Sequence, residues 1–129
     1  MNPVVHFEMP AEDNARTKKF YETVFGWQMT ETGAEMGNYL LAGTTETDPT
    51  TMRPKNPGAI NGGFYKKGRF GTSSHVVISV HDIKAHIEKV KTAGGTVEGE
   101  PIDIPGIGTY VMFHDTEGNR VGMLQPKGM

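Results

Sequence analysis

The sequence contains no cysteine among its 129 residues. That absence excludes disulfide bonds, thiolate nucleophiles and thiolate metal ligands. The chain also lacks an excess of charge of either sign, because 13 basic and 15 acidic side chains leave a formal net charge of -2. Binding to a nucleic-acid backbone favours strongly basic domains, so this composition argues against that class of function.

Long hydrophobic runs are missing as well. No window reaches the ~18 consecutive apolar residues that a membrane-spanning helix needs. The first nine residues include His6 and Glu8 and do not show the basic and then apolar pattern of a secretory leader. We therefore expect a cytoplasmic protein without a membrane or nucleic-acid partner.

Glycine, by contrast, is abundant. The chain has 17 glycines and eight prolines, whereas glycine makes up about 7% of an average protein. This composition indicates many turns, and it favours several short strands over a helical bundle.

An internal repeat divides the chain. A shift of 69 residues, from position 5 to position 74, aligns residues 5–9 with residues 74–78. The same shift brings two further pairs into coincidence, Asp13 with Asp82 and Gly26 with Gly95. In each half an aspartate suited to capping a helix follows an alternating strand, and a glycine suited to ending the helix follows an amphipathic stretch.

Each half is therefore predicted to have the order β-α-β-β-β. In the first half we expect strands at residues 4–9, 27–32, 38–42 and 59–65, with a helix between Asp13 and Gly26 and a long loop at 43–58. In the second half we expect strands at 74–80, 96–104, 109–114 and 119–124, with a helix after Asp82. In the first helix, Thr17, Phe20, Tyr21 and Val24 form the predicted apolar face. The modules are predicted to be residues 1–67 and 68–129 of a single domain.

Two of the five histidines occupy equivalent positions in the repeat, His6 and His75. Side chains alternate along a strand, so His6 shares a face with Glu8, while His75 shares a face with Val77 and Ser79. Both histidines are predicted to point away from the helix and, if the halves pack with two-fold symmetry, toward a shared cleft. A pair of hydrogen-bonded histidines in a mostly apolar cavity fits the same spacing.

The order of the motifs resembles that of the glyoxalase/bleomycin resistance/dioxygenase superfamily, also called the vicinal oxygen chelate superfamily. The resemblance rests on five segments: 5–9 (VHFEM), 20–27 (FYETVFGW), 59–63 (AINGG), 74–80 (SHVVISV) and 113–120 (FHDTEGNR). It is strongest to the branch related to lactoylglutathione lyase. The resemblance implies an α+β fold in which two tandem β-α-β-β-β modules form a curved mixed-sheet cup, and it implies a homodimer.

The resemblance also implies a set of metal ligands. Metal-dependent members take ligands from the first and fifth strands, where this chain has His6 and His75, and carboxylates from the fourth and eighth. Those two carboxylate positions are assigned to Asn61 and Gly122, and neither residue is a carboxylate. Two histidines fall short of the three or four protein ligands usual for zinc. A divalent metal held by His6 and His75 would need a further ligand, such as Glu8, His114 or Glu117.

Two functions follow as hypotheses. In the first, the cup binds a small apolar or aromatic molecule without the full metal site and without any cofactor. Its substrate-binding residues would be Asn61, Met52, Tyr110, Met112 and His114, with the loop at 43–58 as a lid. In the second, the protein is a lyase or isomerase that uses a non-standard metal or acid/base site. The catalytic candidates for that reaction are His6, Glu8 and His75.

Overall fold

A computed structural model describes residues 1–68 and 71–128 of the chain. The chain divides into two compact units. The N-terminal unit comprises His6–Ser74, and the C-terminal unit comprises His75–Met129 together with Met1–Val5. Among the described residues, no helix is both long enough and apolar enough to cross a membrane.

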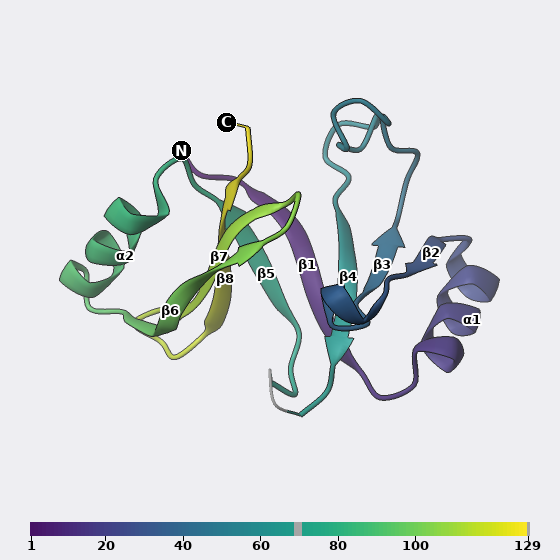
Figure 1. Ribbon diagram of the computed structural model, residues 1–129, viewed down its shortest axis with the longest axis horizontal. Coiled ribbons are helices and arrows are strands. Elements are labelled where there is room, and N and C mark those ends of the chain that lie inside the picture. The colour runs from purple at the N-terminus through teal and green to yellow at the C-terminus, as the bar shows by residue number, and fades with distance from the viewer. Residues whose placement is uncertain (69–70, 129) are drawn as a thin grey trace. The chain divides into compact units, whose positions relative to one another are not determined.

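The predicted element order is confirmed in both halves (Figure 1). The first half contains β1 (Val4–Ala11), α1 (Asn14–Phe25), β2 (Gln28–Glu31), a short 3-10 turn η1 (Ala34–Met36), β3 (Leu40–Gly43) and β4 (Asn61–Lys66). The second half contains β5 (His75–Ser79), α2 (Ile83–Thr92), β6 (Thr96–Ile104), β7 (Gly108–His114) and β8 (Arg120–Pro126). The fold class is thus confirmed as α+β with two β-α-β-β-β modules.

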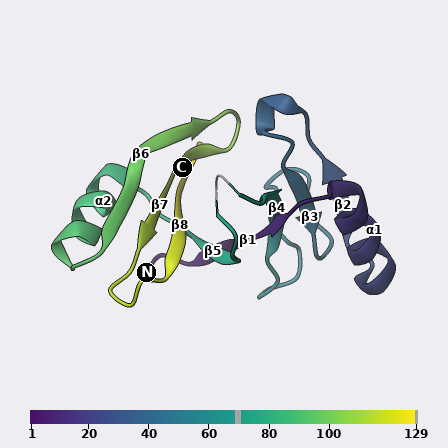
Figure 2. The ribbon, with the colours of Figure 1, turned by 90° about the horizontal axis from the view of Figure 1, so that it is seen from below.

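Each module builds a mixed sheet with the same topology. In the first half the strand order is β2-β3-β4-β1, and β1 runs parallel to β4. In the second half the order is β6-β7-β8-β5, and β5 runs parallel to β8. Figures 1 and 2 show α1 next to β2 and α2 next to β6, in agreement with the helix contacts in each unit.

The predicted strand parity is also confirmed. Phe7 and Met9 of β1 pack against the core of the N-terminal unit, which consists of Ala11, Met29, Leu40, Ala42 and Phe64. Ile78 of β5 packs against the core of the C-terminal unit, which consists of Val80, directly after β5, with Ile83, Val111 and Met123. His6 with Glu8 and His75 with Val77 therefore lie on the opposite faces of their strands, away from these cores.

Both predicted helix starts are confirmed. The side chain of Asp13 accepts a hydrogen bond from Arg16 N at 3.0 Å, and that of Asp82 accepts one from Ala85 N at 3.1 Å. The helix ends differ. Gly26 ends α1 in the left-handed conformation, at φ 70°, whereas α2 ends at Ala93 with φ -84°. Gly95 instead lies close to His114 O and the Val90 side chain, where a Cβ atom would collide.

The predicted apolar face of α1 is only partly buried. Tyr21 stacks on Trp27 with ring centroids 4.6 Å apart and lies 5.2 Å from the Phe64 ring. Phe20 and Val24 are 53% and 54% exposed, so these two residues of the predicted face lie at the surface. Within this face, the Tyr21 ring provides the contacts with Trp27 and Phe64.

Candidate functional site

A tyrosine hydroxyl lies between two predicted site residues on the face of the first sheet that points away from α1. Tyr39, directly before β3, donates a hydrogen bond to Glu8 Oε2 at 2.8 Å. The same oxygen lies 2.9 Å from His6 Nε2. All three side chains are half-buried. The structure therefore joins His6 and Glu8, which were predicted from strand parity, through a third residue that was not.

The strand register explains why the tyrosine ring fits there. Glu8 of β1 and Leu41 of β3 both pair with Gly63 of β4. The Tyr39 ring lies over Gly63, and any Cβ atom at that position would overlap the ring. Glycine at position 63 thus provides the space in which the phenol reaches both His6 and Glu8.

The C-terminal unit repeats this arrangement. Val77 of β5 and Met112 of β7 both pair with Gly122 of β8. The Tyr110 hydroxyl lies over Gly122, where a Cβ atom would overlap it, and 3.5 Å from His75 Nε2. His75 itself is buried, at 8% exposure. A histidine, a tyrosine and a glycine therefore recur together in both modules.

The repeat differs at the position of Glu8. Val77 in the second module occupies the place of Glu8 in the first, as the shared register with Gly122 and Gly63 shows. The side chain at this position of the second module is therefore not a carboxylate. The Tyr110 hydroxyl donates a hydrogen bond to Met112 Sδ at 2.8 Å. The tyrosine hydroxyl of the first module thus contacts an imidazole and a carboxylate, whereas that of the second contacts the His75 imidazole and the Met112 thioether.

Asn61 anchors the long loop. Its Oδ1 accepts a hydrogen bond from Thr44 N at 2.9 Å, and its Nδ2 donates one to Thr47 Oγ1 at 2.8 Å. Asn61 pairs with His6 in the β1–β4 register, so the start of the loop is tied beside the His6 strand. Met52, another predicted binding residue, is 74% exposed in that loop and has a positive φ of 60°.

His114 lies at the end of β7 beside Glu98 and Arg120. Its Nε2 is 3.4 Å from Glu98 Oε1, and the Arg120 guanidinium contacts the same carboxylate at 3.0 Å. The hydrogen bond from Arg120 holds the pKa of Glu98 below its ordinary value, against the opposing effect of partial burial. In the following turn, the hydrogen bond from Asn119 similarly lowers the pKa of Asp115.

Sequence reasoning missed Tyr39, although the repeat contains a signal for it. A shift of 71 residues, from position 39 to position 110, aligns Tyr39-Leu40-Leu41 with Tyr110-Val111-Met112. This shift differs from the one that aligns the first strands of the halves, because the connections between strands differ in length. Only the strand register brings the two tyrosines into equivalent places.

The register also shows which residues of β4 and β8 correspond between the modules, while the assignment of the implied carboxylate positions to Asn61 and Gly122 stays a prediction. Gly63 is the counterpart of Gly122, since each pairs with the residue two places after the strand histidine. Asn61 instead corresponds to Arg120, two residues before the glycine in each case. Among the described residues, no group of three or more histidine, aspartate or glutamate side chains could hold a metal ion. This donor set does not fit a metal centre with three or four protein ligands.

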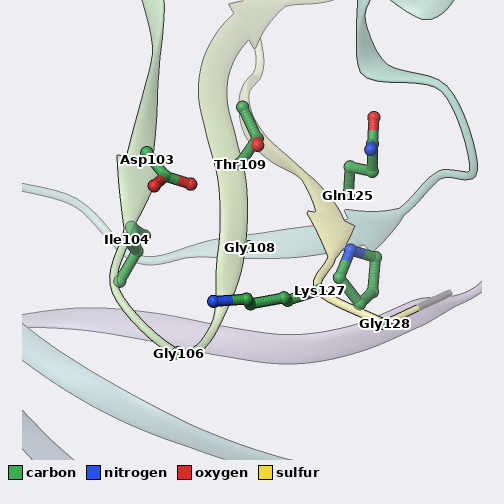
Figure 3. A pocket seen from close by; sticks show the side chains of 9 residues that line it. Asp103, Ile104, Gly106, Gly108, Thr109, Gln125, Lys127 and Gly128 are labelled. Atoms are coloured by element: carbon green, nitrogen blue, oxygen red, sulfur yellow. The ribbon is translucent and has the colours of Figure 1, made fainter.

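A small open pocket lies elsewhere in the C-terminal unit (Figure 3). It has a volume of ≈ 250 Å³ and lies between the β6–β7 turn and the end of β8. Its lining is Asp103, Ile104, Gly106, Gly108, Thr109, Gln125, Pro126, Lys127 and Gly128. None of the predicted site residues is among them, and ligand pockets are usually larger, at ~300–1,000 Å³.

A family comparison agrees with the fold. The model of the Glyoxalase/Bleomycin resistance protein/Dioxygenase superfamily matches residues 4–123. A Mycobacterium tuberculosis protein, CFP32, has glyoxylase in its name and is 34% identical over 112 residues, which cover 83% of this chain and 38% of that protein. The chain thus spans about two fifths of that relative's length. A glyoxylase-like domain-containing protein of Didymella fabae is 31% identical over 87% of this chain and 84% of its own.

Solved structures show the same fold at lower sequence identity. A methylmalonyl-CoA epimerase of Streptomyces coelicolor, solved with 2-nitronate-propionyl-CoA, superposes with a TM-score of 0.71 at 16% identity. The match covers 100% of this chain and 97% of the epimerase chain.

Proposed function

Because the chain belongs to the glyoxalase/bleomycin resistance protein/dioxygenase superfamily, we propose that it binds a small apolar or aromatic molecule without a divalent metal. The observation that carries this proposal is the pair of tyrosine-covered glycines. Gly63 and Gly122 provide no side chain to act as a ligand, and a tyrosine lies over each of them.

The exposed surface beside these tyrosines suits an apolar or aromatic ligand. In the N-terminal unit, Leu41 of β3 lies two residues after Tyr39, on the same side of the chain, and is 41% exposed. In the C-terminal unit, Met112 follows Tyr110 on the same face of β7 and is partly buried. Tyrosine combines a large apolar surface with one polar handle, and methionine adapts to irregular shapes.

Metal content tests the first half of the proposal. Protein purified without a histidine tag is expected to contain no stoichiometric zinc, nickel, manganese or iron, and its melting temperature should not change with a chelator. A ligand that binds only the folded state would raise that temperature. Stoichiometric metal that disappears in His6→Ala or His75→Ala would contradict the proposal.

Binding of anilinonaphthalene sulfonate, an aromatic dye, tests the second half. The dye is expected to bind saturably, and Leu41→Glu should weaken its binding because the change places a charge beside Tyr39. Phe20→Glu is the matched control, since it places the same negative charge on the exposed face of α1 instead. Binding that survives Leu41→Glu but is lost in Phe20→Glu would assign the dye to α1 and count against the proposal.

A second candidate function is proton transfer by an isomerase or lyase. The observation that favours it is the chain of contacts from His6 through the Tyr39 hydroxyl to Glu8. Such a chain can hold or move a proton at a bound molecule. If this hypothesis is right, carbonyl compounds with an acidic C–H bond take up deuterium from heavy water in the presence of the wild-type protein, and Glu8→Gln abolishes this uptake. Absence of uptake across a broad panel of such compounds would leave binding as the function.

A further inference from the structure

Two atoms of the kinds that bind metals converge on one oxygen in the N-terminal unit. His6 Nε2 and Glu8 Oε2 lie 2.9 Å and 2.8 Å from the Tyr39 hydroxyl oxygen. Imidazole nitrogen and carboxylate oxygen are both zinc ligands. The phenol oxygen therefore lies at the point that an ion shared by His6 and Glu8 would occupy.

The proton on that hydroxyl decides the state of the imidazole. A phenol has one O–H donor, and Tyr39 donates it to the carboxylate of Glu8. Toward His6 the same oxygen can only accept, so His6 Nε2 carries a proton in this arrangement. A protonated ring nitrogen has no lone pair for a metal, because imidazole ligands bind through an unprotonated nitrogen.

The backbone holds Tyr39 in this position. Its carbonyl oxygen accepts hydrogen bonds from Thr32 Oγ1 at 2.6 Å and from Thr32 N at 3.1 Å. On its other side the ring lies against Gly63. The hydroxyl is thus placed by contacts at both ends of the residue and not only by its contacts with His6 and Glu8.

We infer that the Tyr39 hydroxyl takes the place of a divalent cation between His6 and Glu8, which makes Tyr39 the residue that keeps this module metal-independent. The inference rests on the proposed metal-independent function. It implies that removal of the hydroxyl opens a two-ligand site for a cation that prefers imidazole and carboxylate, such as Co²⁺ or Zn²⁺. Both side chains would move closer, since zinc distances to such ligands are ~2.0–2.2 Å.

The second module provides an internal control. Tyr110 lies 3.5 Å from His75 Nε2, but Val77 stands where the first module has Glu8. In the second module a valine thus stands at the position of Glu8, and no gain in metal affinity is expected from removal of the Tyr110 hydroxyl.

Titration with Co²⁺ tests the inference, because visible absorption reports the ligands and geometry of the ion without any need for activity. Tyr39→Phe removes only the hydroxyl, and Tyr39→Leu removes the whole phenol in case the ring edge still blocks the ion. At least one of them is expected to bind Co²⁺ on the order of 10-fold more tightly than the wild type, a size typical of changes around metal ligands. Tyr110→Phe should match the wild type, and Glu8→Gln added to the Tyr39 variant should remove the gain.

The outcomes separate this inference from the proposed function. If the wild type is free of metal and both folded Tyr39 variants bind Co²⁺ no better, the inference is wrong and metal-independent binding still stands. An equal gain in Tyr110→Phe would also overturn it. Tight binding by the wild type, unchanged in the Tyr39 variants, would overturn both statements. Circular dichroism of each variant establishes that it is folded before the titration.

Discussion

At the residue scale, two adjacent glycines in β4 make room for rings on opposite faces of the sheet. A Cβ atom at Gly62 would overlap the Phe7 ring on the core face, and one at Gly63 would overlap the Tyr39 ring on the other face. Successive residues of a strand point to opposite faces, so a diglycine lets two aromatic side chains lie directly against the backbone. The packing of the core therefore depends on Gly62, and the position of Tyr39 in the candidate site depends on the adjacent Gly63.

Gly63→Ala is expected to disturb the site and destabilise the N-terminal unit. The added methyl group must displace the Tyr39 ring, and insertion of a methyl into a packed site typically costs ~1–3 kcal/mol. Chemical denaturation should show this loss, and the NMR signals of His6 should shift as Tyr39 moves. Gly43→Ala is the control, because its nearest atom would be Gln28 O at 3.4 Å. Equal stability of the two variants would refute the steric argument.

Strand alternation was enough to predict that His6 and Glu8 share a face, because the period of two is local to the strand. The role of Tyr39 could not be predicted in the same way. The residue lies 33 positions from His6 and 31 from Glu8, and it meets them only through the β3–β4–β1 pairing. The amide of Asn61 likewise reveals its role as a loop anchor only through Thr44 and Thr47.

At the scale of elements, the two helices carry different residue types at positions that are equivalent in the repeat. The shift of 69 residues places Lys89 and Ala93 of the second half at the positions of Phe20 and Val24. Phe20 and Val24 are exposed on α1, and Lys89 and Ala93 are exposed in and after α2. The fold of a module therefore does not require large apolar residues at these positions.

Phe20→Lys, which copies the residue of α2, is expected to leave the free energy of unfolding within ~0.5 kcal/mol of the wild type. Tyr21→Ala should instead cost roughly 2 kcal/mol or more, because it removes the ring that packs on Trp27 and Phe64. Urea denaturation of the two variants measures both values. A loss for Phe20→Lys as large as that for Tyr21→Ala would show that the outer face of α1 contributes to the folded state.

At the scale of the whole molecule, the acid sensitivity of the chain should reflect carboxylates that the fold keeps ionised. The hydrogen bond from Arg120 lowers the pKa of Glu98 from 4.5, and the hydrogen bonds from Asn119 lower the pKa of Asp115 from 3.8. The unfolded chain takes up these protons at a higher pH than the folded chain does. The stabilising contribution is therefore complete above the unfolded pKa and disappears as the pH falls through the folded pKa.

The melting temperature is accordingly expected to fall as the pH drops below about 4.5, the ordinary pKa of Glu98. Glu98→Gln should melt below the wild type at neutral pH, and the two curves should converge in acid, where the wild-type carboxylate is protonated. Glu100→Gln, at an exposed position of the same strand β6, is the control and should follow the wild-type curve. A constant difference between Glu98→Gln and the wild type at every pH would show that the Arg120 contact does not depend on charge.

The sequence by itself determined the two β-α-β-β-β modules, their aspartate-capped helices and the faces of His6, Glu8 and His75. These features depend on periods of two and 3.6 residues and on local capping, which act over a few neighbouring positions. The module boundary at residues 67 and 68, the homodimer and the cytoplasmic location stay predictions.

The tertiary structure alone decided that Tyr39 lies between His6 and Glu8, that Gly63 corresponds to Gly122, and that Phe20 and Val24 are exposed. Each of these depends on pairing or packing between segments far apart in the chain, and spacing within one segment carries no information about such contacts.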